Sequence, residues 1–338
     1  MDWFERLTGF KETNYAETRT KLAVDGDRLK SLVNGKDYGI GELELVSLET
    51  LRARLQSAGG RLGRLRVSLV TGDVRQMHRE SEYAGALFQV ASQFNLLEMV
   101  GPSVTPEHGV TIYQHDYTQG PACAIAAGAA TIYRNYFANV NGAEGQTAKR
   151  QLDGLAELAR SLGEALGRPV EALWEMRNGY ALCSEVGLAD IAEYIRAIAP
   201  SMVDNLRGKL AIGLHHNVEV TDGVVANPAP TVSQAFCSAL PVAYSRVPAA
   251  KWEAFASLVL EAAYEATMCA AVLNAERGGS NIVLLTSLGG GAFGNDEAWI
   301  DSAIRRALKM ASGFELDVRL VSYDVPTATF RQIVRDYR

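Results

Sequence analysis

The 338-residue chain has few cysteines, no excess of positive charge and no long uninterrupted apolar run. Its four cysteines form no CxxC pair, so the ligand spacing of a zinc finger is absent. Each stands among apolar neighbours, which is typical of reduced thiols in a core: Cys123, Cys183, Cys237 and Cys269. The formal net charge of −6 offers no broad basic field to a nucleic-acid backbone, although backbone N–H groups can still bind a small anion locally.

The N-terminus predicts neither export nor insertion into a membrane. Its first ten residues, MDWFERLTGF, are charged and too short in apolar length for a signal peptide. No uninterrupted apolar stretch approaches the ~20 residues that a membrane-spanning helix needs. Together with the unpaired cysteines, these features lead us to expect a cytoplasmic protein without a membrane partner.

The order of apolar segments predicts a layered α/β fold. The composition, 48% hydrophobic and 21% charged, is that of an ordinary globular protein. The continuous apolar run NIVLLTSL suits a strand that is covered by helices on both faces. Strands are predicted within segments 64–74, 86–92, 209–223, 231–245, 281–288 and 314–324. Helical patterns separate several of them, and one helix begins near Pro121.

Two regions lie outside this alternation. Residues 1–62 are polar and locally helical, and we expect an N-terminal extension packed on an α/β domain that spans 63–338. Residues 146–209 predict a helical insert in that domain. Several leucines of the insert follow helical spacing, which favours a face toward its own core over a coiled-coil or partner surface: Leu152, Leu155, Leu158, Leu162 and Leu166.

A glycine-rich loop, TSLGGGAFGNDEAW, joins the apolar run to a helix that begins near Asn295, its predicted N-cap. Glycines let backbone N–H groups point into one concavity and bind an anion, and ligands of open α/β sheets bind beyond the carboxyl ends of strands. No Lys-Ser or Lys-Thr follows the glycines, which excludes a Walker loop. No acidic strand follows either, which argues against a dinucleotide fingerprint. A purely structural turn remains the alternative.

In this loop and four other segments, the chain resembles the macrodomain family, an ADP-ribose-binding fold. The other segments are VTGDV (70–74), QVASQFNLLE (89–98), GVTIYQHDYTQGPACAIAAG (109–128) and VRLVSYD (318–324). The resemblance covers about 73–140 and 210–325 in pieces. It implies a divergent macrodomain: a three-layer mixed sheet flanked by helices, with an N-terminal helical extension and a helical insertion. The first loop, within 109–128, departs from the family: it lacks the glycine triplet and the Gly-Gly-Gly and Gln-Glu-Glu signature of poly-ADP-ribose glycohydrolases.

The resemblance also implies where ADP-ribose would bind. Asp73 would accept a hydrogen bond from the adenine amino group and Val74 would lend a backbone contact, although Gly72-Asp73 also suits a simple turn. Phe293 would flank the ribose. The glycine loop would wrap the diphosphate through Ser287, Gly289, Gly290, Gly291, Ala292, Phe293, Gly294 and Asn295.

Catalysis in macrodomain hydrolases takes place at the anomeric carbon of the distal ribose. Such chemistry needs a carboxylate, or a water oriented by one, near that carbon. Asp116 is our predicted water-orienting base, Gln119 would donate to the ribose or the α-phosphate, and His115 would transfer protons. Asn95 would touch the distal ribose or else satisfy its own loop backbone. The surrounding polar groups are Glu98, Glu107, His108, Tyr113 and Gln114; for each group a solvated loop residue is the alternative.

The sequence therefore predicts an ADP-ribosyl glycohydrolase that needs no cofactor. The alternatives are a module that only binds ADP-ribose or an NAD-derived nucleotide, and an interaction protein whose insert docks a partner. We expect no metal at His215-His216, because adjacent residues of a strand point to opposite faces.

Overall fold

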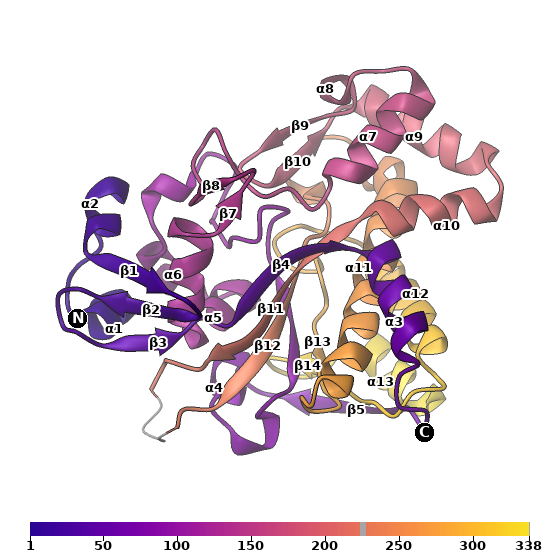
Figure 1. Cartoon of the computed structure of the whole chain (residues 1–338). Helices are drawn as coiled ribbons and strands as arrows, with labels where there is room; N and C mark the ends of the chain where they lie inside the picture. The colour runs from indigo at the N-terminus through magenta and orange to yellow at the C-terminus, as the bar shows by residue number, and fades with distance from the viewer. Residues whose placement is uncertain (224–227, 338) are drawn as a thin grey trace.

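A seven-stranded mixed sheet forms the centre of the molecule in the computed structural model, which describes residues 1–223 and 228–337 (Figure 1). Its strand order is β4-β11-β12-β6-β13-β14-β5. The last five strands in this order are parallel, and β11 runs antiparallel to both of its neighbours. The strands are β4 Glu42–Ser47, β5 Arg66–Thr71, β6 Leu87–Ala91, β11 Ala211–Glu219, β12 Thr231–Cys237, β13 Ile282–Leu285 and β14 Asp317–Ser322.

Helices cover both faces of this sheet, which confirms the predicted layered α/β fold. In β13, Val283 and Leu285 pack into one core cluster while Leu284 packs into another on the opposite face. One face carries α3 Leu48–Ala58, α10 Pro200–Lys209, α11 Ala249–Glu276, α12 Glu297–Met310 and α13 Ala328–Asp336. The other face carries α4 Val74–Met77, α5 Gln119–Ala126 and α6 Gly128–Tyr136.

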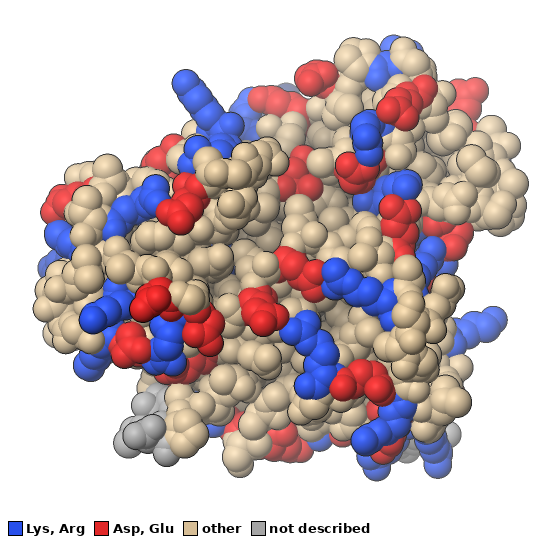
Figure 2. Space-filling view, viewed as in Figure 1, with Lys and Arg blue, Asp and Glu red and all other residues tan. Residues whose placement is uncertain are grey.

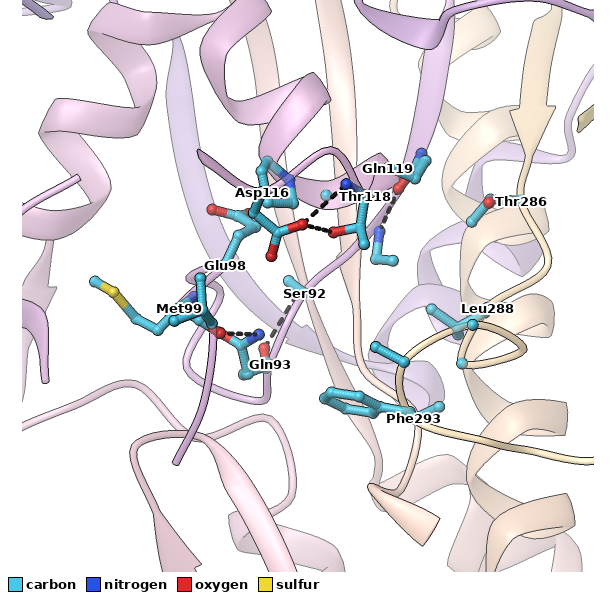
Figure 3. A pocket seen from close by; sticks show the side chains of 18 of the residues that line it. Ser92, Gln93, Glu98, Met99, Asp116, Thr118, Gln119, Thr286, Leu288 and Phe293 are labelled. Atoms are coloured by element: carbon cyan, nitrogen blue, oxygen red, sulfur yellow. Dashed lines mark hydrogen bonds between the residues drawn. The ribbon is translucent and has the colours of Figure 1, made fainter. Parts of the chain in front are cut away.

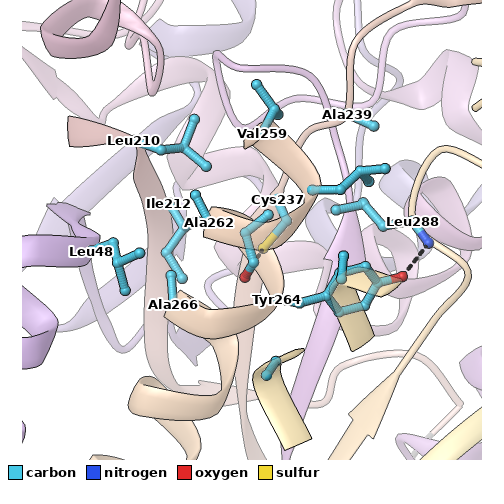
Figure 4. Packing of buried hydrophobic residues seen from close by; sticks show 14 of the residues in the cluster. Leu48, Leu210, Ile212, Cys237, Ala239, Val259, Ala262, Tyr264, Ala266 and Leu288 are labelled. Atoms are coloured by element: carbon cyan, nitrogen blue, oxygen red, sulfur yellow. Dashed lines mark hydrogen bonds between the residues drawn. The ribbon is translucent and has the colours of Figure 1, made fainter. Parts of the chain in front are cut away.

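The longest helix, α11, is the centre of the larger core. Its small residues let it lie close to the sheet: Ala262 and Ala266 pack in the same cluster as Ile212 and Cys237 of the strands (Figure 4). By length and composition alone α11 could cross a membrane, but 83% of its most apolar window is buried within the fold. The four cysteines are buried and free, as expected for core thiols.

The N-terminal 62 residues contain strands as well as the predicted helices. Besides α1 Trp3–Thr8, α2 Tyr15–Thr20 and α3, they form a three-stranded sheet of β1 Leu22–Asp25, β2 Arg28–Ser31 and β3 Asp37–Gly39. Their β4 extends the central sheet by pairing with β11. These strands are short and largely polar, so their apolar periodicity is weak in the sequence. The domain boundary at residue 62 stays a prediction.

The insert at 146–209 differs from the predicted run of helices at its centre. It contains α7 Ala156–Leu166, α8 Val170–Leu173 and α9 Glu185–Ala197, but the helix predicted across 169–186 is wrong. In its place stands an antiparallel hairpin of β9 Trp174–Arg177 and β10 Tyr180–Cys183. Its turn residues Asn178 and Gly179 have φ values of 48° and 81°, and Asn-Gly favours such a two-residue turn.

The leucine stripe of the insert faces the core, as the sequence favoured. Leu155, Leu158 and Leu162 are buried in the larger core cluster. The predicted helix after Pro121 is interrupted at Ala127, whose φ of −110° and ψ of 58° separate α5 from α6. The remaining short elements are β7 Asn139–Val140, β8 Ala143–Glu144, and the 3-10 turns η1 Ser81–Tyr83, η2 Pro106–His108, η3 Thr111–His115 and η4 Val242–Tyr244.

Candidate functional site

A cleft opens beyond the carboxyl ends of the parallel strands β6, β12 and β13 (Figure 3). The space between its walls, including the part open to solvent, is about 810 Å³. The sequence analysis predicted a ligand at this edge of the sheet, beyond the carboxyl ends of the strands. Its lining includes Ser92, Gln93, Glu98, Met99, Asp116, Gln119, Tyr180, Tyr244, Ser287, Gly289, Gly291, Ala292 and Phe293.

The glycine loop (286–295) forms one wall of the cleft, and its packing requires a glycine at position 289. Gly289 has a φ of +73°, and a Cβ there would lie 2.4 Å from the Cβ of Ala239. Asn295 ties the two ends of the loop together, because its N–H donates to the Gly289 carbonyl at 2.9 Å and its side chain to that of Leu240 at 2.8 Å. Asn295 is buried and does not line the cleft. The N-cap of α12 is Asp296, not Asn295 as predicted.

Three consecutive backbone N–H groups of this loop have no hydrogen-bond partner among the described residues. Within the described residues, the amides of Gly291, Ala292 and Phe293 donate to no other group, and all three residues line the cleft. The amides of Gly290 and Gly294 instead donate to carbonyls of the loop itself, at 3.1 and 3.0 Å. Because a Cβ at Gly291 would meet nothing within 4 Å, a ligand can approach the backbone there. The loop is therefore suited to binding an anion.

The base of the glycine loop is fixed by the buried Tyr264 of α11 (Figure 4). Its hydroxyl donates to the Thr286 carbonyl at 2.6 Å and accepts from the Leu288 N–H at 2.9 Å. The Gln89 side chain accepts from the Thr286 N–H at 3.2 Å. Burial raises the pKa of Tyr264, so the hydroxyl keeps its proton and remains a donor. The loop thus starts from a rigid position above the sheet.

The opposite wall is the acid turn (92–99), which follows β6. Gln93 braces it, since its side chain accepts from the Met99 N–H at 2.8 Å and donates to the Met99 carbonyl at 3.2 Å. Its backbone N–H also donates to the Leu97 carbonyl at 2.9 Å. Leu96 has a φ of 64°, in the left-handed region that non-glycine residues seldom adopt. The turn is therefore held in one defined conformation by its hydrogen bonds.

Glu98 brings a buried carboxyl group to this wall. Its residue is 2% exposed and lines the cleft, and Arg134 Nη2 lies 3.4 Å from each carboxyl oxygen. Its backbone N–H donates to the Tyr113 hydroxyl at 3.1 Å. Burial raises the pKa of Glu98 to about 7, and Arg134 and Tyr113 oppose that rise. The group can therefore both give and take a proton near neutral pH.

Asp116 also lines the cleft, but its carboxylate is engaged in shaping the backbone. Its Oδ1 accepts from the Thr118 N–H at 2.9 Å and from the Thr118 hydroxyl at 2.6 Å, just before α5 begins (Figure 3). His115 is exposed and does not line the cleft; its ring lies 3.3 Å from the amide of Gln114. The catalytic roles of these residues stay predictions.

Gln119 lines the cleft, and both the oxygen and the nitrogen of its amide hydrogen-bond to the backbone of β6. Its oxygen accepts from the Ala91 N–H at 2.8 Å and its nitrogen donates to the Gln89 carbonyl at 2.7 Å, so the side chain continues the hydrogen bonding of β6. Asn95 is fully buried and outside the cleft; it accepts from the Leu97 N–H at 3.1 Å, as in the alternative that the sequence left open. Asn95 therefore does not reach a ribose in the cleft, and Gln119 has one amide N–H beyond its bond to Gln89.

Asp73 and Val74 lie outside the cleft lining. Asp73 is the N-cap of α4 and accepts from the Arg75 N–H at 2.8 Å, which is the turn role that the sequence left as the alternative. It follows β5, two strands from β13, or about 10 Å at the usual strand spacing. An adenine contact at Asp73 stays a prediction.

An aromatic cluster of Tyr180, Tyr244 and Phe293 joins three distant segments at the cleft. Their ring centroids are 5.2 to 5.7 Å apart. Tyr180 belongs to β10, and its hydroxyl donates to the Met99 carbonyl at 2.7 Å. The sequence predicted only Phe293 of this cluster, because Tyr180 lay in a segment assigned to a helix. The Asn-Gly turn before Tyr180 was the signal that could have revealed it.

The cleft has no basic side chain in its described lining, where the ionisable groups are the acids Glu98 and Asp116 and two tyrosines. Acidic and basic side chains alternate over the face shown in Figure 2, without a large patch of one sign. An anion in the cleft would therefore be held by backbone amides. Among the described residues no group of three or more His, Cys, Asp or Glu could hold a metal ion.

No family model matches the chain, and no curated protein matches it in sequence. Among solved structures, it is similar to poly(ADP-ribose) glycohydrolase from Thermomonospora curvata, with 15% identity over 96% of this chain and 97% of that one and a TM-score of 0.45. It is also similar to the enzyme from Deinococcus radiodurans in complex with ADP-ribose, with 14% identity over 88% and 94% and a TM-score of 0.46. At these values no residue is equated between the proteins.

Proposed function

We propose that the protein hydrolyses ADP-ribosyl bonds at the anomeric carbon of the distal ribose. One observation carries the proposal: a buried carboxyl group, Glu98, lines the same cleft as three glycine-loop residues whose amides have no partner in the described part of the chain. The amides suit a diphosphate, and the carboxyl group suits proton transfer at a glycosidic bond. ADP-ribose, which the macrodomain-like motifs of the sequence indicate as the ligand, contains both a diphosphate and a ribose with an anomeric carbon.

Glu98 would act first as an acid and then as a base. With its pKa near 7, a fraction of the group is protonated at neutral pH and can give its proton to the leaving atom as the bond to the anomeric carbon breaks. The carboxylate then accepts a proton from the water that adds to the same carbon. The products are free ADP-ribose and the acceptor with its proton restored. The balance requires water alone and no cofactor.

The alternative function is a module that binds ADP-ribose without cleaving it. The hydrogen bonds of Asp116 and Gln119 favour this alternative, because Asp116 Oδ1 and the Gln119 amide already have partners within the chain. In a binding module Glu98 would only shape the cavity.

The test measures turnover and binding on the same protein. ADP-ribosylated proteins, nucleic acids and small ADP-ribose conjugates are incubated with wild type while ADP-ribose release is followed, and ADP-ribose binding is measured by calorimetry. Glu98→Gln should lower turnover by roughly 10²- to 10⁴-fold and leave the Kd for ADP-ribose within a few-fold. The control is Glu265→Gln, since Glu265 is also buried and paired with arginine but lies outside the cleft.

The outcomes separate the two functions. Tight binding without release of ADP-ribose from any conjugate would support the binding module. Absence of binding would contradict both functions. A cytoplasmic location and the absence of membrane and nucleic-acid partners remain proposals, which fractionation and filter-binding assays would test.

A further inference from the structure

We propose that Arg134 is a positioning residue that holds the Glu98 carboxyl group against the cleft and governs how readily it changes its charge. The inference rests on the proposed function for its catalytic meaning, but the contacts that carry it are independent of any substrate. Arg134 belongs to α6, is fully buried and does not itself line the cleft. Its effect on the cleft would pass through Glu98 and through the turn that carries Glu98.

The guanidinium group of Arg134 is fixed on several sides. Nη2 lies 3.4 Å from both oxygens of Glu98 and 3.2 Å from the Thr131 hydroxyl. Nε donates to the Leu96 carbonyl at 3.1 Å. The group lies 3.9 Å from the ring centroid of Phe236, which supports its flat face. Because the Arg134 guanidinium is held in one position, it favours one position of the Glu98 carboxyl group.

The bond to Leu96 couples Arg134 to the backbone that carries Glu98. Leu96 holds the left-handed conformation of the acid turn, which costs on the order of 1 kcal/mol or more for a non-glycine residue. Arg134 binds the carbonyl of this residue and the carboxyl group two residues later with the same guanidinium. Loss of Arg134 would therefore release both the turn and the side chain that the turn directs.

Arg134 is also the charged group that opposes burial at Glu98. Burial raises the pKa of Glu98, whereas the cation beside it favours the carboxylate. The other titratable groups around this pair are Tyr113 from η3, Cys123 from α5 and His215 from β11. Burial raises the pKa of the first two well above their usual values and, with Arg134, lowers that of His215. All three are neutral near pH 7, which leaves Arg134 as the cation that sets the charge of Glu98.

A second ion-paired glutamate shows what a merely structural pair looks like. Glu265 is 4% exposed and binds Arg52 and Arg306 at the junction of α3, α11 and α12, away from the cleft. Those arginines are partly exposed, whereas Arg134 is not. The Arg52–Glu265 pair therefore provides the matched control for a change of ion pairing without a change at the cleft.

The experiment titrates Glu98 directly by NMR of protein labelled with ¹³C at the glutamate carboxyl carbons, with Glu98→Gln used to assign the signal. Arg134→Met removes the cation and keeps much of the volume, and it should raise the pKa of Glu98 by at least one unit, a tenfold change in its protonation equilibrium. Arg134→Lys keeps a charge but loses the fork that binds Leu96 and Glu98 together, so it should give a smaller rise. Arg52→Met should leave the Glu98 titration unchanged.

Titration curves of Glu98 that coincide in wild type and the folded Arg134 variants would overturn the inference. If Arg134→Met does not fold, the Arg134→Lys curve decides in the same way. For a hydrolytic wild type, the pH–rate profile should move with the titration, and Arg134→Lys should recover part of the rate lost in Arg134→Met. A shifted titration in a protein that cleaves no ADP-ribosyl bond would uphold the role of Arg134 and contradict the proposed function.

Discussion

The two walls of the cleft differ in what they offer a ligand. The glycine loop presents backbone with few side chains, and its three unpaired amides stand in an exposed segment. The acid turn is largely buried and presents a side chain, Glu98, whose residue is bound by Tyr113 of η3 and Arg134 of α6. Main-chain amides suit the binding of a group that is the same in every substrate, such as a diphosphate. A buried acid suits proton transfer at the bond that is cleaved. Substitutions at the two walls should therefore change different properties of the protein.

Gly289→Ala should produce the largest loss of stability on the glycine wall. The new Cβ would need a φ of +73° and would lie 2.4 Å from Ala239 and 2.7 Å from the Asn295 amide. Strain and overpacking together should lower the free energy of unfolding by about 2–5 kcal/mol. Urea denaturation measures it, and an unchanged midpoint would show that the loop is softer than its contacts indicate.

Stability should depend on pH at the acid wall. The pKa of Glu98 rises from about 4.3 in an unfolded chain to about 7 in the fold, so the folded state binds the proton more tightly. Wild type should therefore lose stability relative to Glu98→Gln as pH rises from about 4.3 to about 7, by on the order of 1–3 kcal/mol. Denaturation of both proteins across this range measures the difference. Parallel curves would mean that Glu98 titrates normally.

Gly291→Val should impair binding without impairing the fold. A Cβ at Gly291 meets nothing within 4 Å, but it would stand among the unpaired amides of the cleft. The Kd for ADP-ribose should rise roughly tenfold or more, about 1.4 kcal/mol, while the unfolding midpoint stays constant. Gly313→Val is the matched control, because its Cβ also meets nothing and it lies outside the cleft. Equal Kd values for both variants would contradict an anion site at these amides.

Tyr180→Phe should have the smallest effect, and it tests whether the hairpin supports the acid wall. The substitution removes the bond of 2.7 Å to the Met99 carbonyl and keeps the ring among Tyr244 and Phe293. The expected loss of stability is about 1 kcal/mol. Turnover should fall only a few-fold. A loss as large as that of Glu98→Gln would mean that Tyr180 takes part in catalysis and does not only support the acid wall.

Local sequence was sufficient for the glycine wall and insufficient for the acid wall. Apolar runs bounded by glycines predicted β5, β6 and β13 and the loop after β13, because those signals lie within a few residues of each other. Glu98 stood in the candidate region but was not chosen, since its burial depends on Arg134, 36 residues further along the chain. Asp116 was preferred for its place in a loop, and its bonds to Thr118 could not be foreseen from that place.

The pairing of β4 with β11 has a consequence for shortened forms of the protein. This strand covers the outer side of β11 along six consecutive residue pairs. A chain that began after residue 62 would expose a row of unsatisfied N–H and C=O groups along β11, a template for intermolecular strand pairing. We expect the truncated protein to self-associate. The N-terminal residues would then be needed for solubility, although none of them lines the cleft.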